Sequence, residues 1–454
     1  MTNSTSPIEL PAVTGPVFRP GDDGYDRELA GFQTAYTHRP DLVVGAVHAE
    51  DVRASVEYAA RRRIPVAVQA TGHGLSVPAD HGLLISTRRM TEVSIDPQAR
   101  TARVSAGVQA EALIAAAVAH GLAPLNGSSP SVGVIGYHLG GGLGILARTF
   151  GYAADHVRAV ELVTADGRLR RLEPGDELFG VVLGSGGNFG VVTALELALF
   201  PIAEVYGGQL VFDSALVEPA LEAWRLWTGE VPEELTSAIT MMTMPDVPAI
   251  PEPLRGRYIA TINIAYTGVA AAGERLVRPL REVGARIVDD LRAMPYAETH
   301  GIYRDPDFPH AYTATNALLS ELTVDAAQAF LDVTGPEAPV PSVAGFRHLG
   351  GALRRRGPAG IAVDHCAAEY NARIITMPAD DGSDLRDHHD PIAKTLAPWT
   401  IGHHLNFLYG AGDRAGEDQT RAGYAPGTYA RLRALKAEYD PANLFRFNRN
   451  IVPA

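Results

Sequence analysis

The sequence predicts an α+β fold divided into two domains, and three observations support this prediction. The chain has 454 residues, which is more than one hydrophobic core usually supports. Glycine is concentrated in three clusters, at residues 72–74, 133–144 and 184–190. After Pro201 strand-like and helix-like segments continue without such clusters, which indicates a second, α+β domain from about residue 205.

The first elements form a strand–helix–strand unit at residues 41–47, 50–63 and 66–70. The strand segments are apolar and rich in β-branched residues, and apolar residues recur on one face of the helix between them. In such crossover units ligands bind at the loops beyond the strands. The loop after the second strand contains His73 between two glycines.

The remaining elements follow from periodicity and turn residues. Gly121 is expected to end an Ala-rich helix in the C′ position, and Asp166-Gly167 to turn a hairpin. Trp224 and Trp227, three residues apart on a helix, are expected in the core, and Pro426 near the start of a C-terminal helix. Expected strands are 83–86, 91–95, 101–105, 157–164, 169–172, 191–200 and 258–266; expected helices are 109–120, 177–183 and 269–283.

Composition excludes several classes of function. The 39 Lys and Arg residues against 52 Asp and Glu give a net charge of −13, which argues against nucleic acid or an anionic membrane as a partner. The single cysteine, Cys366, cannot form an intrachain disulfide. We find no secretion signal and no apolar run of the ~20 residues that a membrane span needs, so a cytoplasmic location is expected.

The glycine clusters require an explanation of their own. Glycine lets a backbone come close to a ligand, and amides exposed in this way bind phosphate oxygens without Lys or Arg. Tight turns between sheets are the alternative for any one cluster. The sequence lacks a Gly-x-Gly-x-x-Gly motif in the Rossmann position and a Gly-x-x-x-x-Gly-Lys-Ser/Thr loop, so a dinucleotide would be bound in another way.

Four motifs resemble those of the berberine-bridge-enzyme-like FAD-linked oxidases of the vanillyl-alcohol-oxidase superfamily. Residues 69–74, Gln-Ala-Thr-Gly-His-Gly, resemble Arg-Gly-Gly-Gly-His-Ser, and residues 129–142 resemble Cys-Pro-Thr-Val-Gly-x-x-Gly-x-x-x-Gly-Gly-Gly. Residues 186–193 match Gly-Gly-Asn-Phe-Gly-Val-Val-Thr. Residues 439–451 match the C-terminal signature of the family almost throughout. The resemblance covers nearly the whole chain, and the length is similar to that of the compact bacterial members.

The resemblance implies a PCMH-type, two-subdomain FAD-binding domain over residues 20–204. It implies an α+β substrate-binding domain with an antiparallel sheet over 205–410, and a C-terminal segment, 411–454, that returns to the first domain. FAD would be attached covalently through its 8α carbon to His73, and such a tether gives a very high effective concentration. The implied cofactor-binding residues are His73, Gln69, Ala70, Thr71, Gly72, Gly74, Ser129, Val132, Gly133, Gly136, Tyr137, Gly140, Gly187, Val192, Asn448 and Asn450.

Three departures from the family pattern change the expectation. Ser129 replaces the cysteine that forms a second, 6-S-cysteinyl bond in some members, so one covalent bond is expected. Val132 matches the valine that leaves O2 access to the flavin in relatives, which favours an oxidase over a dehydrogenase. Gln69 replaces a cationic residue beside the pyrophosphate.

The reaction requires a substrate C–H at the flavin and a base for the neighbouring proton. His404 takes the place of a tyrosine in a Tyr-x-Asn-Phe strand of the family, here His403 to Phe407, and its ordinary pKa near 6.5 suits a base. His404 and Asn406 are therefore the predicted catalytic residues, with a surface or packed histidine as the alternative. The glutamate base of the plant alkaloid enzymes is missing from residues 352–355.

Other residues are weaker candidates. Glu369, Tyr370 and Tyr424 are alternatives for lining the pocket, each equally explained by structure. His388, His389 and Asp390 lack the spacing of a metal site, and no metal is expected. The predicted partners are a small-molecule alcohol, amine or sugar and O2; a homodimer stays open. A flavin dehydrogenase with another acceptor, or a flavin-loaded binding protein, is the alternative function.

Overall fold

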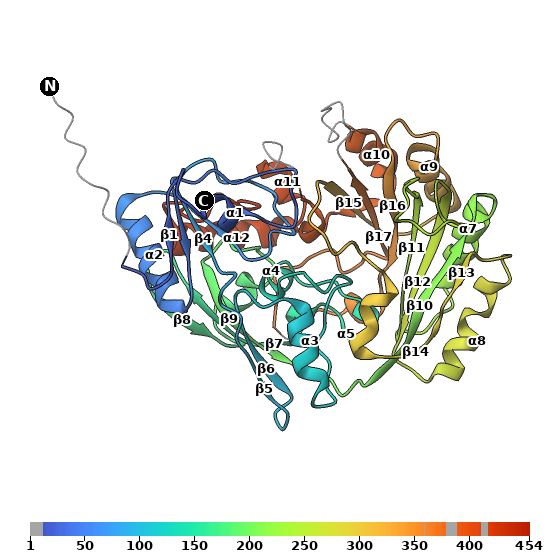
Figure 1. Cartoon of the computed structure of the whole chain (residues 1–454), viewed down its shortest axis with the longest axis horizontal. Coiled ribbons are helices and arrows are strands. Elements are labelled where there is room, and N and C mark those ends of the chain that lie inside the picture. Colours follow the sequence, from blue (N-terminus) through green and yellow to red (C-terminus); the bar gives the residue numbers. More distant parts are fainter. Residues whose placement is uncertain (1–11, 358, 378–387, 410–415) are drawn as a thin grey trace.

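The computed structural model of the chain describes residues 12–357, 359–377, 388–409 and 416–454. Within these residues the strands form three sheets, two built from the first part of the chain and one from the second (Figure 1). The change occurs between β9, Val191–Ala198, and β10, Glu204–Phe212. This position supports the proposed division of the chain at residue 205.

The first sheet has the strand order β1-β2-β4-β3. Its members are β1, Val17–Phe18; β2, Leu42–Gly45; β3, Val66–Gln69; and β4, Leu83–Ser86. Strands β2 and β3 run parallel to β4, which lies between them, while β1 is antiparallel to β2. The loop after β3 therefore leaves the sheet at the carboxyl ends of the parallel strands, and this loop contains His73.

The second sheet is antiparallel, with the order β5-β6-β9-β7-β8. Besides β9, it contains β5, Val93–Asp96; β6, Thr101–Ser105; β7, Val157–Val163; and β8, Leu169–Leu172. The hairpin of β7 and β8 turns through Gly167, whose φ is 75°. The predicted hairpin is confirmed.

The third sheet is also antiparallel and has the order β13-β10-β12-β11-β16-β17-β15-β18, with β14 paired to β10. Its further strands are β11, Leu235–Thr243; β12, Tyr258–Tyr266; β13, Val288–Asp289; β14, Arg292–Pro295; β15, Thr313–Leu319; β16, Ser342–His348; β17, Tyr370–Thr376; and β18, Thr400–Gly402. The α+β class and the antiparallel sheet of the second region are confirmed.

Four helices cover the outer face of the third sheet (Figure 1): α7, Val217–Thr228; α8, Ala270–Arg281; α9, Val324–Thr334; and α10, His389–Leu396. Trp224 and Trp227 lie in the core between these helices and the sheet, as predicted. Alternate strand residues, such as Phe346 and Ile374, face this core. Their neighbours Arg347 and Arg373 therefore face the other way.

The other helices belong to the first region, the connections and the tail. They are α1, Tyr25–Leu29; α2, Ala49–Arg62; α3, Ala110–Val118; α4, Val134–Leu139; α5, Ala147–Phe150; α6, Phe179–Val182; α11, Glu417–Arg421; and α12, Pro426–Tyr439. Leu432 and Leu435 of α12 pack into the same core as β2, β4 and β9. The tail thus returns to the first region.

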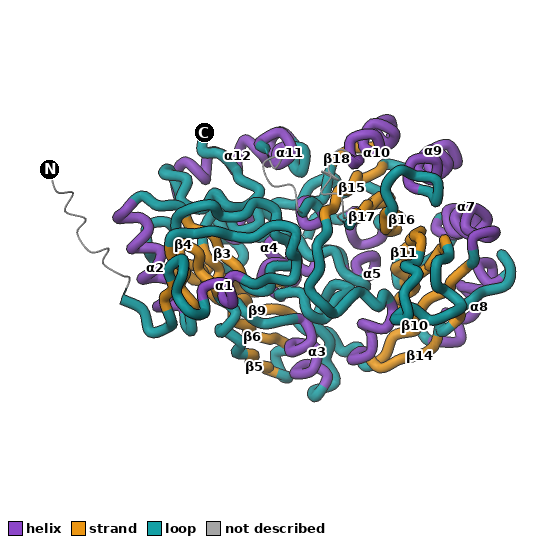
Figure 2. Tube along the Cα trace, turned by 45° about the horizontal axis from the view of Figure 1, so that its top comes forward, coloured by secondary structure: helices purple, strands orange, loops and turns teal. Residues whose placement is uncertain are grey.

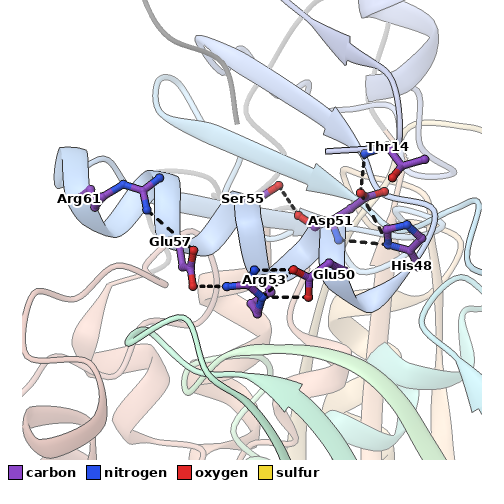
Figure 3. A network of polar contacts seen from close by, with 8 residues as sticks. All are labelled: Thr14, His48, Glu50, Asp51, Arg53, Ser55, Glu57 and Arg61. Carbon is purple, nitrogen blue, oxygen red and sulfur yellow. Dashed lines mark hydrogen bonds and ion pairs between the residues drawn. The ribbon is translucent and has the colours of Figure 1, made fainter. Parts of the chain in front are cut away.

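A polar network fixes the start of α2 (Figure 3). The Asp51 carboxylate is buried and accepts hydrogen bonds from the backbone N–H groups of Thr14 at 2.7 Å and Val47 at 3.0 Å. His48 Nδ1 accepts from the Asp51 N–H at 3.2 Å as the helix cap. Because a buried carboxylate needs such partners, Asp51 holds the segment before β1 against the helix.

Loops and short helices, including α4 and α5, occupy much of the space between the first two sheets and the third (Figure 2). One sequence prediction fails here. Residues 403–407 were expected to be a strand, but β18 ends at Gly402 and a 3₁₀ turn follows at Leu405–Phe407. The turn brings Asn406 against the end of α4, where its Nδ2 donates to the Tyr137 carbonyl at 3.0 Å.

Candidate functional site

A cavity of about 480 Å³ lies where the loops of the first region meet the third sheet. This volume is within the range of pockets for small molecules and cofactors. The first region and the tail contribute most of their residues from four segments, within 66–77, 127–143, 184–192 and 445–449, and also Phe32, His38, Thr87 and Ala106. The second region contributes residues from loop 305–312, from β16 and β17, and from residues 405–409.

His73 lies half-buried in the cavity wall. Its Nδ1 lies 3.0 Å from Thr71 Oγ1, and its Nε2 lies 3.0 Å from Ser131 Oγ. The Phe32 ring stacks on it with 3.8 Å between ring centroids and 11° between planes. Burial, and then the nearby His310, lower the pKa of His73 to about 4. At neutral pH the side chain is therefore an uncharged imidazole held in one orientation.

The second glycine cluster allows a close contact between the two regions. A Cβ added at Gly140 would lie 1.7 Å from Asn406 Oδ1, so any side chain there would displace Asn406. At Gly136 an added Cβ would meet no protein atom within 4 Å. Because Gly136 lines the cavity, its backbone borders open space that a ligand can approach closely.

The third glycine cluster, residues 184–190, also exposes backbone beside open space. Gly186 and Gly187 have φ values of 64° and 86°, and an added Cβ would meet nothing within 4 Å at either position. Asn188 joins this loop to the tail: its Nδ2 donates to the Arg449 carbonyl at 2.9 Å, and its Oδ1 accepts from the Ile451 N–H at 2.8 Å. The glycine loop and the tail are thus held as one unit.

A buried ion pair holds the tail in this position. Lys436 Nζ lies 2.7 Å from Asp440 Oδ2, and both side chains are fully buried. The same ammonium donates to the carbonyls of Asn188 at 2.6 Å and Phe445 at 3.0 Å. Asn448 follows, and its Nδ2 lies 3.4 Å from the Gly187 carbonyl.

The wall formed by the second region consists largely of long side chains that the sequence analysis missed. Arg347 of β16, Arg373 of β17, Tyr312 and Tyr409 all line the cavity. The Tyr312 hydroxyl donates to the His73 carbonyl at 2.7 Å and so links the two regions. A signal was present in the sequence, because each arginine interrupts a strand that is otherwise mainly apolar.

The structure brings most of the predicted site residues together around this cavity. Those that line it are His73, Gln69, Ala70, Thr71, Gly72, Gly74, Ser129, Val132, Gly133, Gly136, Tyr137, Gly140, Gly187, Val192, Asn448 and Asn406. Two predicted residues, His404 and Asn450, are not part of the lining.

Comparisons with known proteins agree with this arrangement. The family described as "FAD binding domain" matches residues 40–173, and the family described as "Berberine and berberine like" matches residues 418–452. An FAD-linked oxidoreductase of Dictyostelium discoideum is 25% identical, covering 97% of this chain and 95% of its own. The (R)-6-hydroxynicotine oxidase of Paenarthrobacter nicotinovorans is 26% identical, covering 97% of both chains. The crystal structure of 6-hydroxy-D-nicotine oxidase from Arthrobacter nicotinovorans has a TM-score of 0.84 at 23% identity, covering 99% of this chain and 100% of the other.

The chain is similar to the berberine-bridge-enzyme-like FAD-linked oxidoreductases, in the two regions that match and over nearly its whole length. It is an FAD-dependent enzyme, and its fold is the PCMH-type FAD-binding fold joined to an α+β domain. The resemblance identified from the four motifs is confirmed.

The residues around the cavity fit the FAD of this family. The glycines at 136, 186 and 187 leave backbone exposed beside open space. In addition, Asn448 Oδ1 is buried without a hydrogen-bond partner in the part of the chain that the structure describes. Buried polar atoms are usually paired, so a bound molecule with hydrogen-bonding groups would complete this wall.

His404 differs from the prediction. It is buried behind the wall, stacked on Tyr152 at 5.8 Å between ring centroids. Neither ring nitrogen has a partner among the described residues. Burial, and then the charge of Arg347, lower the pKa of His404 to about 4. This berberine-bridge-enzyme-like protein therefore holds His404 neutral and out of the cavity, an arrangement that does not support direct removal of a substrate proton.

The weaker candidates for lining the pocket have hydrogen-bond or ion-pair partners elsewhere in the protein. Glu369 forms an ion pair with Arg354, the Tyr370 hydroxyl bonds to Thr228, and Tyr424 donates to the Gly184 carbonyl. None of the three lines the cavity. His389 Nε2 lies 3.0 Å from Thr376 Oγ1. Among the residues described, no group of three or more His, Cys, Asp or Glu side chains is placed to bind a metal.

No helix in the described ranges is both long enough and apolar enough to cross a membrane.

Proposed function

We propose that the protein is an oxidase that carries FAD covalently on His73 and oxidises a carbon bearing a hydroxyl or amino group in a small-molecule alcohol, amine or sugar. FAD held there would supply the acceptor for the substrate hydride and the route by which two electrons reach O2, giving H2O2. The observation that carries the proposal is the position of a neutral, oriented His73 in the wall of a cavity whose other residues match the FAD motifs of the family.

The state of the His73 imidazole supports a covalent bond. Only an unprotonated ring nitrogen has the lone pair that a bond to carbon requires, and the lowered pKa keeps that form dominant at neutral pH. The hydroxyls of Thr71 and Ser131 hold the two ring nitrogens. Ser129 Oγ lies 3.1 Å from Ser131 Oγ, and a serine cannot form the second, thioether bond of doubly tethered relatives.

The choice of O2 as acceptor follows from Val132, which lines the cavity and matches the valine found in oxidases of the family. For the substrate proton, the proposal assigns no contacting base. The turn that carries Asn406 is held through the backbone of residue 404: the His404 N–H donates to Asn316 Oδ1 at 2.9 Å, and the His404 carbonyl accepts from Asn316 Nδ2 at 3.0 Å.

Acid denaturation tests the tether. The precipitated protein should retain yellow, fluorescent flavin, and His73→Ala should leave all flavin in the supernatant. His310→Ala is the matched control, because it removes another histidine from the same cavity and should leave the flavin attached. Flavin released from the unmodified protein would contradict the covalent bond at His73.

A second measurement tests the acceptor. The holoenzyme is photoreduced without oxygen and then mixed with air-saturated buffer in a stopped-flow instrument. An oxidase returns to the oxidised flavin spectrum within seconds, and Val132→Leu should slow this step at least tenfold by obstructing O2. Reoxidation over many minutes in the unmodified protein would instead identify a dehydrogenase that uses another acceptor.

A further inference from the structure

Two arginines lie on the face of the third sheet that borders the cavity. Arg347 of β16 and Arg373 of β17 are on adjacent antiparallel strands, in which Gly345 pairs with Arg373 and Arg347 pairs with Asn371. The two arginines are thus diagonal neighbours on one face, a distance that long side chains can span. Both guanidinium groups lie close to the Phe407 ring, with 5.3 Å and 5.1 Å from Cζ to the ring centroid.

Neither arginine has an acidic partner. In the described ranges no Asp or Glu oxygen lies within the 4.0 Å of an ion pair from either guanidinium. The one hydrogen bond of Arg347 runs from Nη1 to the Leu143 carbonyl, at 3.4 Å. Arg373 donates from Nη2 to the Tyr409 hydroxyl at 2.6 Å, and its Nε is buried without a partner. Most of the donors of these two side chains are therefore free.

The two buried arginines among the described residues, Arg148 and Arg449, donate to backbone carbonyls. Arg347 and Arg373 are partly buried and face the cavity, and Arg373 Nε is buried without a partner. Because a buried donor without a partner is costly, an anion bound in the cavity would be stabilised by these free donors.

The charge of the cavity supports the same conclusion. Three arginines, Arg347, Arg373 and Arg449, line it against one acidic residue, Asp305, although the whole chain carries a net charge of −13. The Asp305 carboxylate accepts a hydrogen bond from the Ser128 hydroxyl and makes no ion pair among the described residues. A locally positive wall in an acidic protein attracts anions selectively.

We propose that Arg347 and Arg373 bind a carboxylate of the substrate, so that the enzyme acts on a small organic acid whose apolar part packs beside Phe407 and Ile375. Guanidinium groups match the planar carboxylate and bind it through paired N–H donors. The oxidation of this acid rests on the proposed function, whereas its binding by the two arginines does not depend on it.

Calorimetric titration of the FAD-loaded full chain tests the proposal. Benzoate is the probe, and benzyl alcohol is the comparison because it has the same ring without the charge. Benzoate should bind at least tenfold more tightly than benzyl alcohol. Arg347→Gln and Arg373→Gln should each weaken benzoate binding at least tenfold and leave benzyl alcohol unchanged. Arg347→Lys and Arg373→Lys keep the charge but lose the paired donors. Their affinity for benzoate should lie between those of the unmodified protein and the glutamine variants.

Arg355→Gln is the matched control, because Arg355 is exposed and pairs with Glu233 outside the cavity; it should not change benzoate binding. Thermal unfolding of each variant checks folding, and the lysine variants keep the test valid if a glutamine variant does not fold. Equal binding of benzoate and benzyl alcohol would overturn the proposal. So would arginine variants that lose FAD but retain benzoate, since the arginines would then serve the cofactor. Loss of flavin from the unmodified protein in acid would contradict the tether and leave the benzoate result readable.

Discussion

The cavity has two walls that are built differently. The loop wall consists of residues 69–74, 133–140 (with the short helix α4) and 184–192, and the other wall contains the strands β16 and β17. The loop wall exposes backbone beside open space at Gly74, Gly136, Gly186 and Gly187. The strands present long side chains, Arg347 and Arg373 among them. The loops thus depend on backbone geometry and the sheet on side-chain chemistry. The first kind suits a cofactor shared by a family, and the second suits a substrate that differs between its members.

The largest expected effect tests whether the loop wall depends on a distant side chain. Lys436→Met would leave Asp440 as a buried, unpaired charge, which costs about 3–5 kcal/mol of unfolding free energy. It would also release the carbonyls of Asn188 and Phe445 and so loosen the loop of residues 184–192. Denaturant unfolding measures the cost.

Lys394→Met is the control for this prediction, because Lys394 is an exposed lysine of α10. Its effect should stay within about 0.5 kcal/mol, as for ordinary surface substitutions. Equal changes in the two variants would show that the buried pair does not hold the tail.

The next prediction concerns His404, a side chain just behind the wall formed by the second region. Its folded-state pKa of about 4 lies below the ordinary value of about 6.5, so the unfolded chain binds more protons in between. Above pH 6.5 His404 is neutral in both states and does not lower the free energy of unfolding. As the pH falls from 6.5 toward 4, the unfolded chain gains a proton first, and the free energy of unfolding falls by up to about 1.4 kcal/mol per pH unit.

His404→Asn should therefore flatten the fall in unfolding free energy between pH 6.5 and 4, by about 2–3 kcal/mol over the window. The buried His38 and His138 are present in both proteins, so their contributions to the pH dependence of the unfolding free energy cancel in the comparison. Parallel pH profiles would refute the lowered pKa. The backbone bonds of residue 404 to Asn316 remain in this variant, so it should also keep a measurable kcat.

The smallest expected effect separates backbone geometry from general stability. Gly187 and Gly121 both have positive φ, 86° and 68°, and space for a Cβ. Gly187→Ala and Gly121→Ala should each cost about 1–2 kcal/mol of unfolding free energy. Only Gly187 lines the cavity, so in the His73→Ala background only Gly187→Ala should weaken FAD binding, at least tenfold by fluorescence titration. A similar loss in both variants would show that stability, not the loop wall, determines binding.

The difference between the walls also explains what could be predicted from the sequence. Glycine motifs record backbone geometry directly, so Gly136, Gly140 and Gly187 could be placed at the site, and strands such as 83–86 and 101–105 could be bounded by their turns. The tail signature contains Asp440, whose carboxylate accepts the N–H groups of Leu444 and Phe445. The tail motif therefore also specifies one backbone conformation.

The second region has no comparable sequence motif that fixes its backbone geometry. Arg347 and Arg373 become neighbours only through the pairing of β16 with β17, and strand pairing over that separation is not encoded in a local motif. The orientation of His404 depended on the end of β18 at Gly402, which propensity does not fix. A turn of three residues, 405–407, decided that Asn406 rather than His404 faces the cavity.

The cavity joins the loop after β3 to residues 445–449, with nearly all of the described chain between them. Translation proceeds from the N-terminus, and domains generally fold as units in that order. His73 therefore leaves the ribosome long before Asn448 exists to close the opposite side. The cavity is therefore complete only after the tail has been translated, and a nascent chain that stalls before residue 436 lacks both the Lys436–Asp440 ion pair and the Asn448 side of the cavity.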